Sequence, residues 1–304
     1  MVVAKQESMT FKQFQKKFQT DQACYEHLYA MKWPKGFKCP ICLHTECYKI
    51  GTRKHPLYQC ISCRHQTSLT AGTIFEKTRL GLRTWFALVF FVSHDKRGVS
   101  AKLMAKELEI SYKTAWTNLH KIRKAMADKD APYKLFGQVE MDDFYIGAPT
   151  ENGKRGRGTD KNQVLVALSK NAKGHPLHVK MEVIEDIKGT TVLELVTKWI
   201  EEQSVIQTDA YSSFPIVQTK GYKLEAEKFD HKKHPEHLKW MHRLISNFKA
   251  FVLGTFHGLD SRHLQSYLDE FCYRFNRRKF ADQLFNRLLH ACVSTETITY
   301  APSI

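Results

Sequence analysis

Two adjacent carboxylates, Asp142 and Asp143, stand in the middle of the segment VEMDDFYIG, residues 139–147. The alternation of apolar and polar residues predicts a half-buried strand, in which neighbouring side chains point to opposite faces. A strand that only packs against a core does not need two charges at its centre. A third carboxylate, Asp209, ends the apolar segment SVIQTD further along the chain. Carboxylates brought together repel one another unless a cation lies between them, so these residue types indicate a metal site.

The segments around these carboxylates predict the elements that position them. Strand-like patterns cover residues 138–147, 162–170 and 176–184, a helical pattern covers 189–203, and a short strand ends at Asp209. This order predicts an α/β domain with a crossover helix. If the fourth strand pairs beside the first, Asp142 and Asp209 meet. Mg2+ prefers such oxygen ligands and supports in-line displacement at phosphorus.

The two neighbouring aspartates are expected to have different roles. Asp142 is the expected metal ligand, and Asp143 alternates to the other face of the strand, where we expect a hydrogen bond or a salt bridge. In the competing interpretation, Asp142 is a solvated residue on an edge strand. The position of Asp209 at the end of another strand favours the metal site.

Two Cys-x-x-Cys pairs predict a structural zinc site. Cys39 and Cys42 form the first pair, Cys60 and Cys63 form the second, and residues 43–59 separate them. Each pair makes a tight turn that directs two thiolates at one point. Two such turns supply the four sulfur ligands that Zn2+ takes in closed structural sites, and the flanking strand-like segments suit a zinc ribbon.

Other residues near the pairs leave alternatives open. A redox-active Cys-x-x-Cys is disfavoured by the presence of two pairs at this spacing, while His44 or His55 could in principle replace one ligand. Cys47 is a spare thiol between the pairs. Three further cysteines lie on helical patterns and are expected to be buried apolar residues: Cys24, Cys272 and Cys292.

Residues 98–126 have the pattern of two helices joined by a short turn. The first helix is expected from Ser100 to Leu108, and Ser111 is a suitable N-cap for the second. The pattern predicts a helix-turn-helix, with an ordinary helical hairpin as the alternative. The inward positions are Leu103, Met104 and Leu108, followed by Ala115, Leu119 and Ile122. At the N-terminal end of the second helix, the side chains expected to contact DNA are Lys113, Thr114 and Asn118.

The charge of the chain points to a polyanionic partner. Its 304 residues carry 47 Lys and Arg against 31 Asp and Glu, a formal net charge of +16 that is spread along the sequence. Nucleic acid is the first candidate, because each neutralised phosphate releases counterions. The longest apolar run, residues 85–92, is too short to cross a bilayer. The first residues lack the pattern of a secretory signal, so we expect an intracellular protein with reduced cysteines.

In this order, the segments CPIC, CISC, GVSAKLMAKELEISYKTAW, VEMDDFYIG, GKRGRG, TDAYSSF and HLQSYLDEFCYRFNRR resemble bacterial insertion-sequence transposases of the DDE superfamily. The resemblance covers nearly all of residues 30–290. It implies an α/β, RNase H-like catalytic domain preceded by a zinc ribbon and a helix-turn-helix. The implied domains are N-terminal helices at 1–32, the zinc ribbon at 33–75, the helix-turn-helix region at 80–130 and the catalytic domain at 136–292.

The same resemblance implies an activity and partners. The enzyme would use Mg2+ to cut and join element ends on double-stranded DNA, as at least a dimer, in the cytoplasm at the nucleoid. Lys154, Arg155 and Arg157 of the GKRGRG loop would contact backbone phosphates, unless the loop is only a solvated hairpin tip. The alternatives are a non-catalytic DNA-binding protein derived from a transposase and an RNase H-like host nuclease.

The resemblance also implies a third metal ligand, often Glu, on a helix after the second aspartate. Alignment of Ser246 and Lys249 with the family pattern places His242 at that position. His242 and Lys249 are seven residues apart and share a helix face, so the lysine is expected to hold a phosphate beside the metal. A histidine suits Mn2+ better than Mg2+. The rival ligand is Glu236 in the first turn of the same helix; the absence of any third ligand would indicate a decayed or repurposed transposase.

Overall fold

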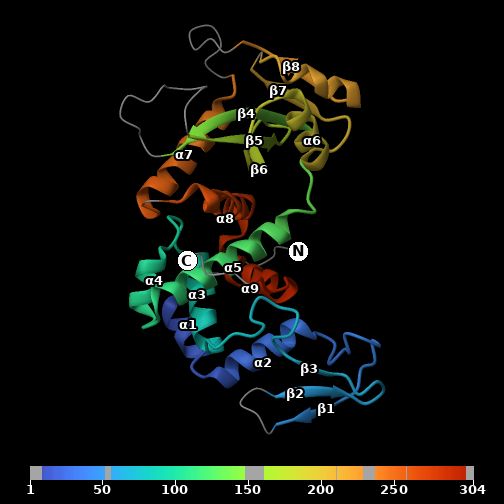
Figure 1. Ribbon diagram of the computed structural model, residues 1–304, viewed down its shortest axis with the longest axis vertical. Helices are drawn as coiled ribbons and strands as arrows, with labels where there is room; N and C mark the ends of the chain where they lie inside the picture. The colour runs from blue at the N-terminus through green and yellow to red at the C-terminus, as the bar shows by residue number, and fades with distance from the viewer. Residues whose placement is uncertain are drawn as a thin grey trace. The chain divides into compact units, whose positions relative to one another are not determined.

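The computed structural model of the chain describes residues 9–51, 56–147, 161–209, 211–228, 237–257 and 259–298 (Figure 1). The chain forms two compact units. The second unit is one continuous segment, Asp130–Lys279, which interrupts the first unit, Met1–Lys129 and Phe280–Ile304. Within the described ranges, we find no helix that combines the length and the apolar character needed to cross a membrane.

The first unit combines helices with a small antiparallel sheet. Its helices are α1 (Phe11–Lys17), α2 (Asp21–Lys32), α3 (Leu82–His94), α4 (Ala101–Glu107), α5 (Tyr112–Asp130), which ends on the first residue of the second unit, and α9 (Leu284–Ser294). The sheet has the order β1 (Cys47–Ile50), β2 (Leu57–Cys60), β3 (Gln66–Ser68).

The last helix of the chain packs on the first. The ring centroid of Phe285 on α9 lies 5.9 Å from that of Phe14 and 5.8 Å from that of Phe18. The expected catalytic domain, 136–292, includes α9, whereas the structure packs this helix in the first unit. The core of the first unit therefore needs both ends of the sequence.

Helices α4 and α5 form the expected helix pair. The Ser111 hydroxyl accepts a hydrogen bond from the amide of Thr114 at 3.1 Å, as expected for an N-cap. The predicted inward positions Met104, Ala115, Leu119 and Ile122 are buried. The prediction for Leu103 is wrong, because its side chain is 44 % exposed. Leu103 lies about 100° around the helix axis from the buried Met104, on a side of α4 that faces solvent.

The second unit contains a mixed sheet with the order β6-β5-β4-β7-β8. Strands β4 (Gln138–Ile146), β5 (Asn162–Lys170) and β6 (Pro176–Ile184) are antiparallel neighbours. After α6 (Gly189–Trp199), strand β7 (Val205–Thr208) pairs parallel to β4, and β8 (Lys223–Ala226) pairs parallel to β7. This strand order and the crossover through α6 confirm the predicted α/β, RNase H-like fold class.

Helices cover both faces of this sheet. Helices α7 (Lys239–Thr255) and α8 (Leu264–Asn276) pack on one face with Phe144, Val164 and Val166. Helix α6 packs on the other face with Val139 and Met141 (Figure 1). Because β5 is buried on both faces, its sequence is a nearly continuous apolar run instead of an alternating one.

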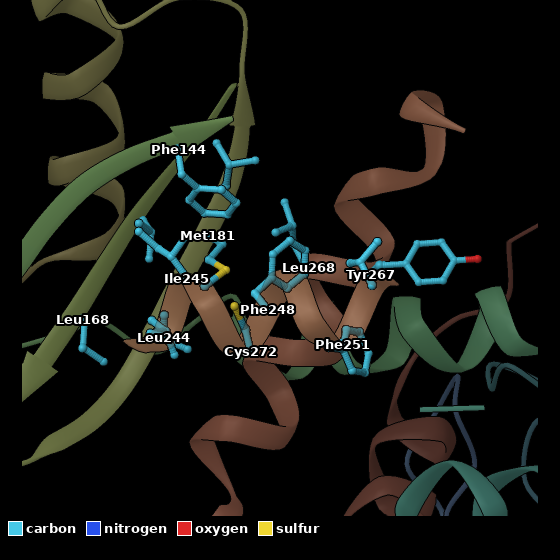
Figure 2. Close-up of a cluster of buried hydrophobic side chains, with 14 of the residues drawn as sticks. Phe144, Leu168, Met181, Leu244, Ile245, Phe248, Phe251, Tyr267, Leu268 and Cys272 are labelled. Atoms are coloured by element: carbon cyan, nitrogen blue, oxygen red, sulfur yellow. The ribbon is translucent and has the colours of Figure 1, made fainter. Parts of the chain in front are cut away.

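Figure 2 shows the cluster that joins α7 and α8 to the sheet. Leu264 and Leu268 of α8 are buried in it, and Phe271 and Phe275 pack against it partly buried. The apolar stripe of this helix is thus covered within the second unit.

Replacement of Phe248 by alanine tests this packing. The fully buried ring of Phe248 lies 5.8 Å from that of Phe144 and 5.3 Å from that of Phe271, centroid to centroid. The cavity left by Phe248→Ala is expected to lower the free energy of unfolding by about 3–5 kcal/mol, measured by urea denaturation. The control is Leu253→Ala on the same helix, where the side chain is 72 % exposed and the expected change is below about 0.5 kcal/mol. Equal losses in the two variants would contradict the burial of Phe248.

The start and the end of the second unit are tied together. The guanidinium of Arg277 lies 2.6 Å from the carboxylate of Asp130, and the side-chain amide of Asn276 donates to the same carboxylate at 2.9 Å. The Arg277 guanidinium also lies 3.7 Å from the centroid of the Tyr273 ring. The two points at which the chain passes between the units are therefore adjacent.

Candidate metal centres and catalytic face

The four predicted zinc ligands lie together in the first unit. The Sγ atoms of Cys39, Cys42, Cys60 and Cys63 are all within 4.8 Å of one another. The distance is 3.5 Å between the sulfurs of Cys39 and Cys63 and between those of Cys42 and Cys60. Tetrahedral Zn–S bonds of about 2.3 Å separate the sulfurs by about 3.8 Å. The four-sulfur group therefore fits a structural zinc ion.

Matching backbone turns build this group. The residue after the second cysteine of each pair, Leu43 or Arg64, has a left-handed backbone with φ of 63° or 60°. In both turns its amide donates to the carbonyl of the first cysteine at 3.1 Å. The hydrogen bond from the backbone N–H of His44 is the largest cause that lowers the pKa of Cys42, and the hydrogen bond with the Cys63 thiol lowers this pKa further. Because zinc binds the thiolate, these donors favour the ligand form of the sulfur.

The other cysteines and the nearby histidines stay outside the group. Cys47 faces Cys60 across the β1–β2 pair without joining the four sulfurs. The four sulfurs assemble without His44, whose imidazole lies 4.0 Å from the Glu46 carboxylate, and His55 lies outside the described residues. The three remaining cysteines are buried, as predicted: Cys24, Cys272 and Cys292.

The alternation along β4 separates the two adjacent aspartates. Phe144 belongs to the core under α7, so Asp142 and Glu140, at even positions, point to the same face. Asp143 points to the face covered by α6. There its carboxylate accepts a hydrogen bond from the side-chain amide of Gln163 at 2.8 Å, which confirms the expected hydrogen bond.

The pairing of β4 with β7 determines where Asp209 lies. The parallel register pairs Glu140 with Gln207. If that register continued for two more residues, Asp209 would come level with Asp142, whose side chain alternates to the face under α7. Neighbouring strands are about 4.8 Å apart, and β7 ends at Thr208. Asp209 follows the carboxyl end of β7, and Asp142 lies in the middle of β4, just beyond the residues of β4 that pair with β7.

Helix α7 runs along β4 over Asp142. The amide of Met241 donates to the carboxylate of Glu140 at 3.2 Å, and seven residues later the ring of Phe248 packs on Phe144. Asp142 therefore lies between the two strand residues that α7 contacts. The Nζ atom of Lys249 is 5.5 Å from the centroid of the Phe144 ring, on the same face of the strand.

His242 follows Met241 in the first turn of α7. Burial lowers the pKa of His242, the carboxylate of Glu140 opposes that effect, and His237 adds to it. A lowered pKa favours the neutral imidazole, which is the form that can bind a metal. The rival ligand, Glu236, lies outside the described residues.

Two carboxylates and one imidazole are a donor set that fits Mg2+ or Mn2+. In the described part of the chain, however, the four cysteines alone bring three or more ligand atoms within 4.8 Å of one another. Asp142, Asp209 and His242 do not form such a group.

The predicted DNA contacts differ in accessibility. Lys113 is exposed and Thr114 is half-buried, both near the N-terminal end of α5. Asn118 is only 7 % exposed, because it lies one turn beyond Ala115 on the inward side of the helix. The loop residues Lys154, Arg155 and Arg157 lie outside the described residues.

The sequence interpretation missed a group of polar residues beside the aspartates, of which Glu140 is buried and Lys170 and Gln207 are half-buried. Glu140 is 3 % exposed, and its carboxylate lies 2.9 Å from the Nζ atom of Lys170. The alternation that singles out Asp142 also places Glu140 on the same face, so this residue could have been found. Lys170 and Gln207 give no such signal, because only the strand pairing brings them near Glu140.

Two family models match the chain. Residues 134–276 match the ISXO2-like transposase domain, and residues 19–66 match the transposase zinc-ribbon domain. The first match contains Asp142, Asp209 and His242, and the second contains the four zinc ligands.

Individual proteins are more distant. The "Uncharacterized protein in transposable element ISH50" of Halobacterium salinarum is 28 % identical over 169 residues, which cover 55 % of this chain and 55 % of that protein. The chain thus spans about half the length of this relative. The "Uncharacterized transposase-like protein" of Haemophilus influenzae is 24 % identical over 110 residues, covering 34 % of this chain and 84 % of that protein.

Two solved structures are each weakly similar to this chain. The catalytic core domain of BIV integrase gives a TM-score of 0.29 at 14 % identity, covering 44 % of this chain and 80 % of that chain. A pre-cleavage Mos1 transpososome gives 0.28 at 12 % identity, covering 71 % and 80 %. The fold class stands on the strand order described above. With the two family matches and the four-cysteine site, it identifies an ISXO2-like transposase domain at residues 134–276 and a transposase zinc ribbon at residues 19–66.

Proposed function

We propose that this protein is a DNA transposase that cuts and joins the ends of an insertion element by metal-dependent phosphoryl transfer. The observation that supports the proposal is the parallel register of β4 and β7, which pairs Glu140 with Gln207. Continued for two residues, this register would bring Asp209 level with Asp142. The match to the transposase domain over residues 134–276 supports the same activity.

The residues of this face have distinct roles in the proposed reaction. Asp142, Asp209 and His242 hold the divalent ion, Mg2+ or Mn2+. When bound, the ion supplies a Lewis acid for the attacking and leaving oxygens of an in-line displacement. The ammonium of Lys249 is placed over Phe144 and neutralises a phosphate next to the scissile bond.

The remaining basic residues bind the substrate, double-stranded DNA. Lys113 and Thr114 of α5 contact it in the first unit, and Lys154, Arg155 and Arg157 contact backbone phosphates. Asn118 acts only if α5 exposes it on binding. A net charge of +16 supports a polyanionic partner. Because two element ends must be joined together, we propose at least a dimer, which acts at the nucleoid in the cytoplasm.

A cleavage assay tests the proposed function. End-labelled duplexes that carry the DNA flanking the coding sequence are incubated with the full chain and Mg2+, Mn2+ or a chelator. We expect nicks at the element boundary with either metal and none with the chelator, and the same duplex with a scrambled boundary should stay intact. Tight binding to the boundary without any metal-dependent nick would contradict the proposal and favour a non-catalytic DNA-binding protein.

The identity of the third ligand predicts a metal preference. Loss of a residue that only orients a metal ligand costs about 10–100-fold in activity. Because His242 is proposed to bind the metal directly, His242→Ala is expected to lower activity by roughly 100-fold or more. His242→Glu is expected to raise cleavage with Mg2+ relative to Mn2+, because a carboxylate is the harder ligand. The ratio of the two rates measures the effect. An unchanged ratio, together with full activity of His242→Ala, would show that His242 is not a ligand.

A further inference from the structure

A chain of hydrogen-bonded polar side chains, with Glu140 buried at one end and Glu225 exposed at the other, lies beside the proposed catalytic aspartates. The Nζ atom of Lys170 is 2.9 Å from one carboxylate oxygen of Glu140 and donates to the side-chain carbonyl of Gln207 at 2.5 Å. The side-chain amide of Gln207 donates in turn to the carboxylate of Glu225 at 2.7 Å. The Glu140 and Lys170 side chains are 4 % and 12 % exposed, so their ion pair is largely shielded from water.

This chain of contacts reaches each element that carries a proposed metal ligand. Glu140 precedes Asp142 by two residues on β4 and points to the same face. Gln207 precedes Asp209 by two residues on β7 and is the register partner of Glu140. The second carboxylate oxygen of Glu140 accepts the hydrogen bond from the amide of Met241, which immediately precedes His242.

The contact to Met241 also supplies what the start of α7 lacks. The residue before the helix, Leu238, has a left-handed backbone with φ of 48° and offers no side-chain acceptor to the first turn. The first amides of a helix need acceptors, and a negative charge at this end is favourable. The Glu140 carboxylate meets both needs from β4, so it fixes the beginning of α7 on that strand.

Stability alone does not explain a buried ion pair at this place. Apolar residues of similar volume are often as stabilising, whereas hydrogen bonds and ion pairs constrain direction as well as distance. Partners that orient metal ligands are typically worth 10–100-fold in metal affinity. A rigid polar connection between β4, β7 and α7 has this orienting geometry.

We propose that Glu140, Lys170 and Gln207 form a positioning network that sets the distance of α7 from β4 and β7. The network thereby sets the separation of His242 from Asp142 and Asp209. The inference rests on the proposed function, and it assigns roles to residues that contact neither the metal nor the DNA.

Two variants of the full chain test the network. Glu140→Gln combined with Lys170→Met removes both charges, so no unpaired ion is left buried, and Gln207→Leu removes the link to β7 while the ion pair is kept. The matched control is Glu182→Gln combined with Lys198→Met. It removes an exposed ion pair of 2.8 Å between β6 and α6.

Mn2+ affinity, measured by calorimetry, and hydrogen exchange of the first turn of α7 are the readouts. We expect Mn2+ binding to weaken about 10–100-fold in both network variants and to stay within about twofold of the wild type in the control. Amides at the start of α7 should exchange faster in the Glu140/Lys170 variant, while affinity for DNA should stay unchanged in all variants.

Where Asp142→Asn weakens Mn2+ binding, unchanged Mn2+ affinity in the folded network variants would overturn the proposal, even if exchange at α7 increased, because the network would then act only as a helix cap. The Asp142→Asn variant separates this failure from that of the proposed function. If Asp142→Asn does not weaken Mn2+ binding, the metal site itself is misassigned. In that case, hydrogen exchange at the start of α7 tests the network. Faster exchange in the network variants shows that the network holds the helix, and unchanged exchange overturns the proposal.

Discussion

Replacement of Asp142 by asparagine is expected to abolish DNA cleavage, and Asp209→Asn is expected to do the same. Asparagine keeps the size of the side chain and removes the charge that holds a divalent ion. Removal of a single group that stabilises transition-state charge costs about 100–1,000-fold, and loss of a metal ligand should cost roughly 1,000-fold or more. Such a loss equals about 4 kcal/mol of barrier. Single-turnover cleavage of boundary DNA measures the effect.

Asp143→Asn is the matched control for this experiment. The substitution is identical and only one residue away, yet Asp143 points to the other face of β4 and binds Gln163. We expect it to retain cleavage within a fewfold of the wild type, and DNA affinity should be nearly unchanged in all three variants. If Asp142→Asn and Asp209→Asn still cut, the catalytic site lies elsewhere. If Asp143→Asn is equally inactive, the assignment of the two faces is wrong.

Removal of zinc is expected to unfold the small sheet of the first unit. Structural zinc contributes about 10–16 kcal/mol in zinc-finger peptides, which matches or exceeds the whole stability of a typical domain. Three short strands, β1–β3, cannot offset that loss through apolar burial. Cys60→Ser, or treatment with a chelator, should release one zinc ion per chain and remove the protection of these strands from hydrogen exchange. The sheet of the second unit should keep its protection.

Cys47→Ser provides the control for the zinc experiment. Cys47 faces Cys60 across two paired strands but lies outside the four-sulfur group. This variant should bind one zinc ion and retain the protection of β1–β3. A Cys60→Ser variant that still holds zinc with full protection would show that the ligand set is not the four predicted cysteines.

The sequence predicts those elements whose pattern is local. Strands β5 and β6 occupy the predicted residues 162–170 and 176–184, because apolar runs bounded by polar turns mark them clearly. Strand β8 was not predicted. Its segment KLEA has only one partly buried residue, Leu224, and the strand exists because β7 offers it a parallel edge.

Long-range relations needed the structure. The level placement of Asp142 and Asp209 was a hypothesis about strand pairing, and the parallel register of β4 with β7 supports it. The role of Glu140 at the start of α7 could not be inferred, since Met241 lies about 100 residues away and no local rule links them. For the same reason, no local pattern predicts the packing of Phe285 on Phe14, and the expected catalytic domain extends to residue 292.

The division of the first unit has a consequence for protein synthesis. Helix α3 ends at His94, and α9, which completes the core of the first unit, begins at Leu284. At 5–20 residues per second, the ribosome needs roughly 10–40 s to synthesise the chain between these two helices. Meanwhile the second unit emerges whole, and the contact between Asp130 and Arg277 can close it. A nascent or truncated chain without α9 would thus carry a finished second unit and an open aromatic surface at Phe14 and Phe18, which a chaperone would have to shield until α9 is made.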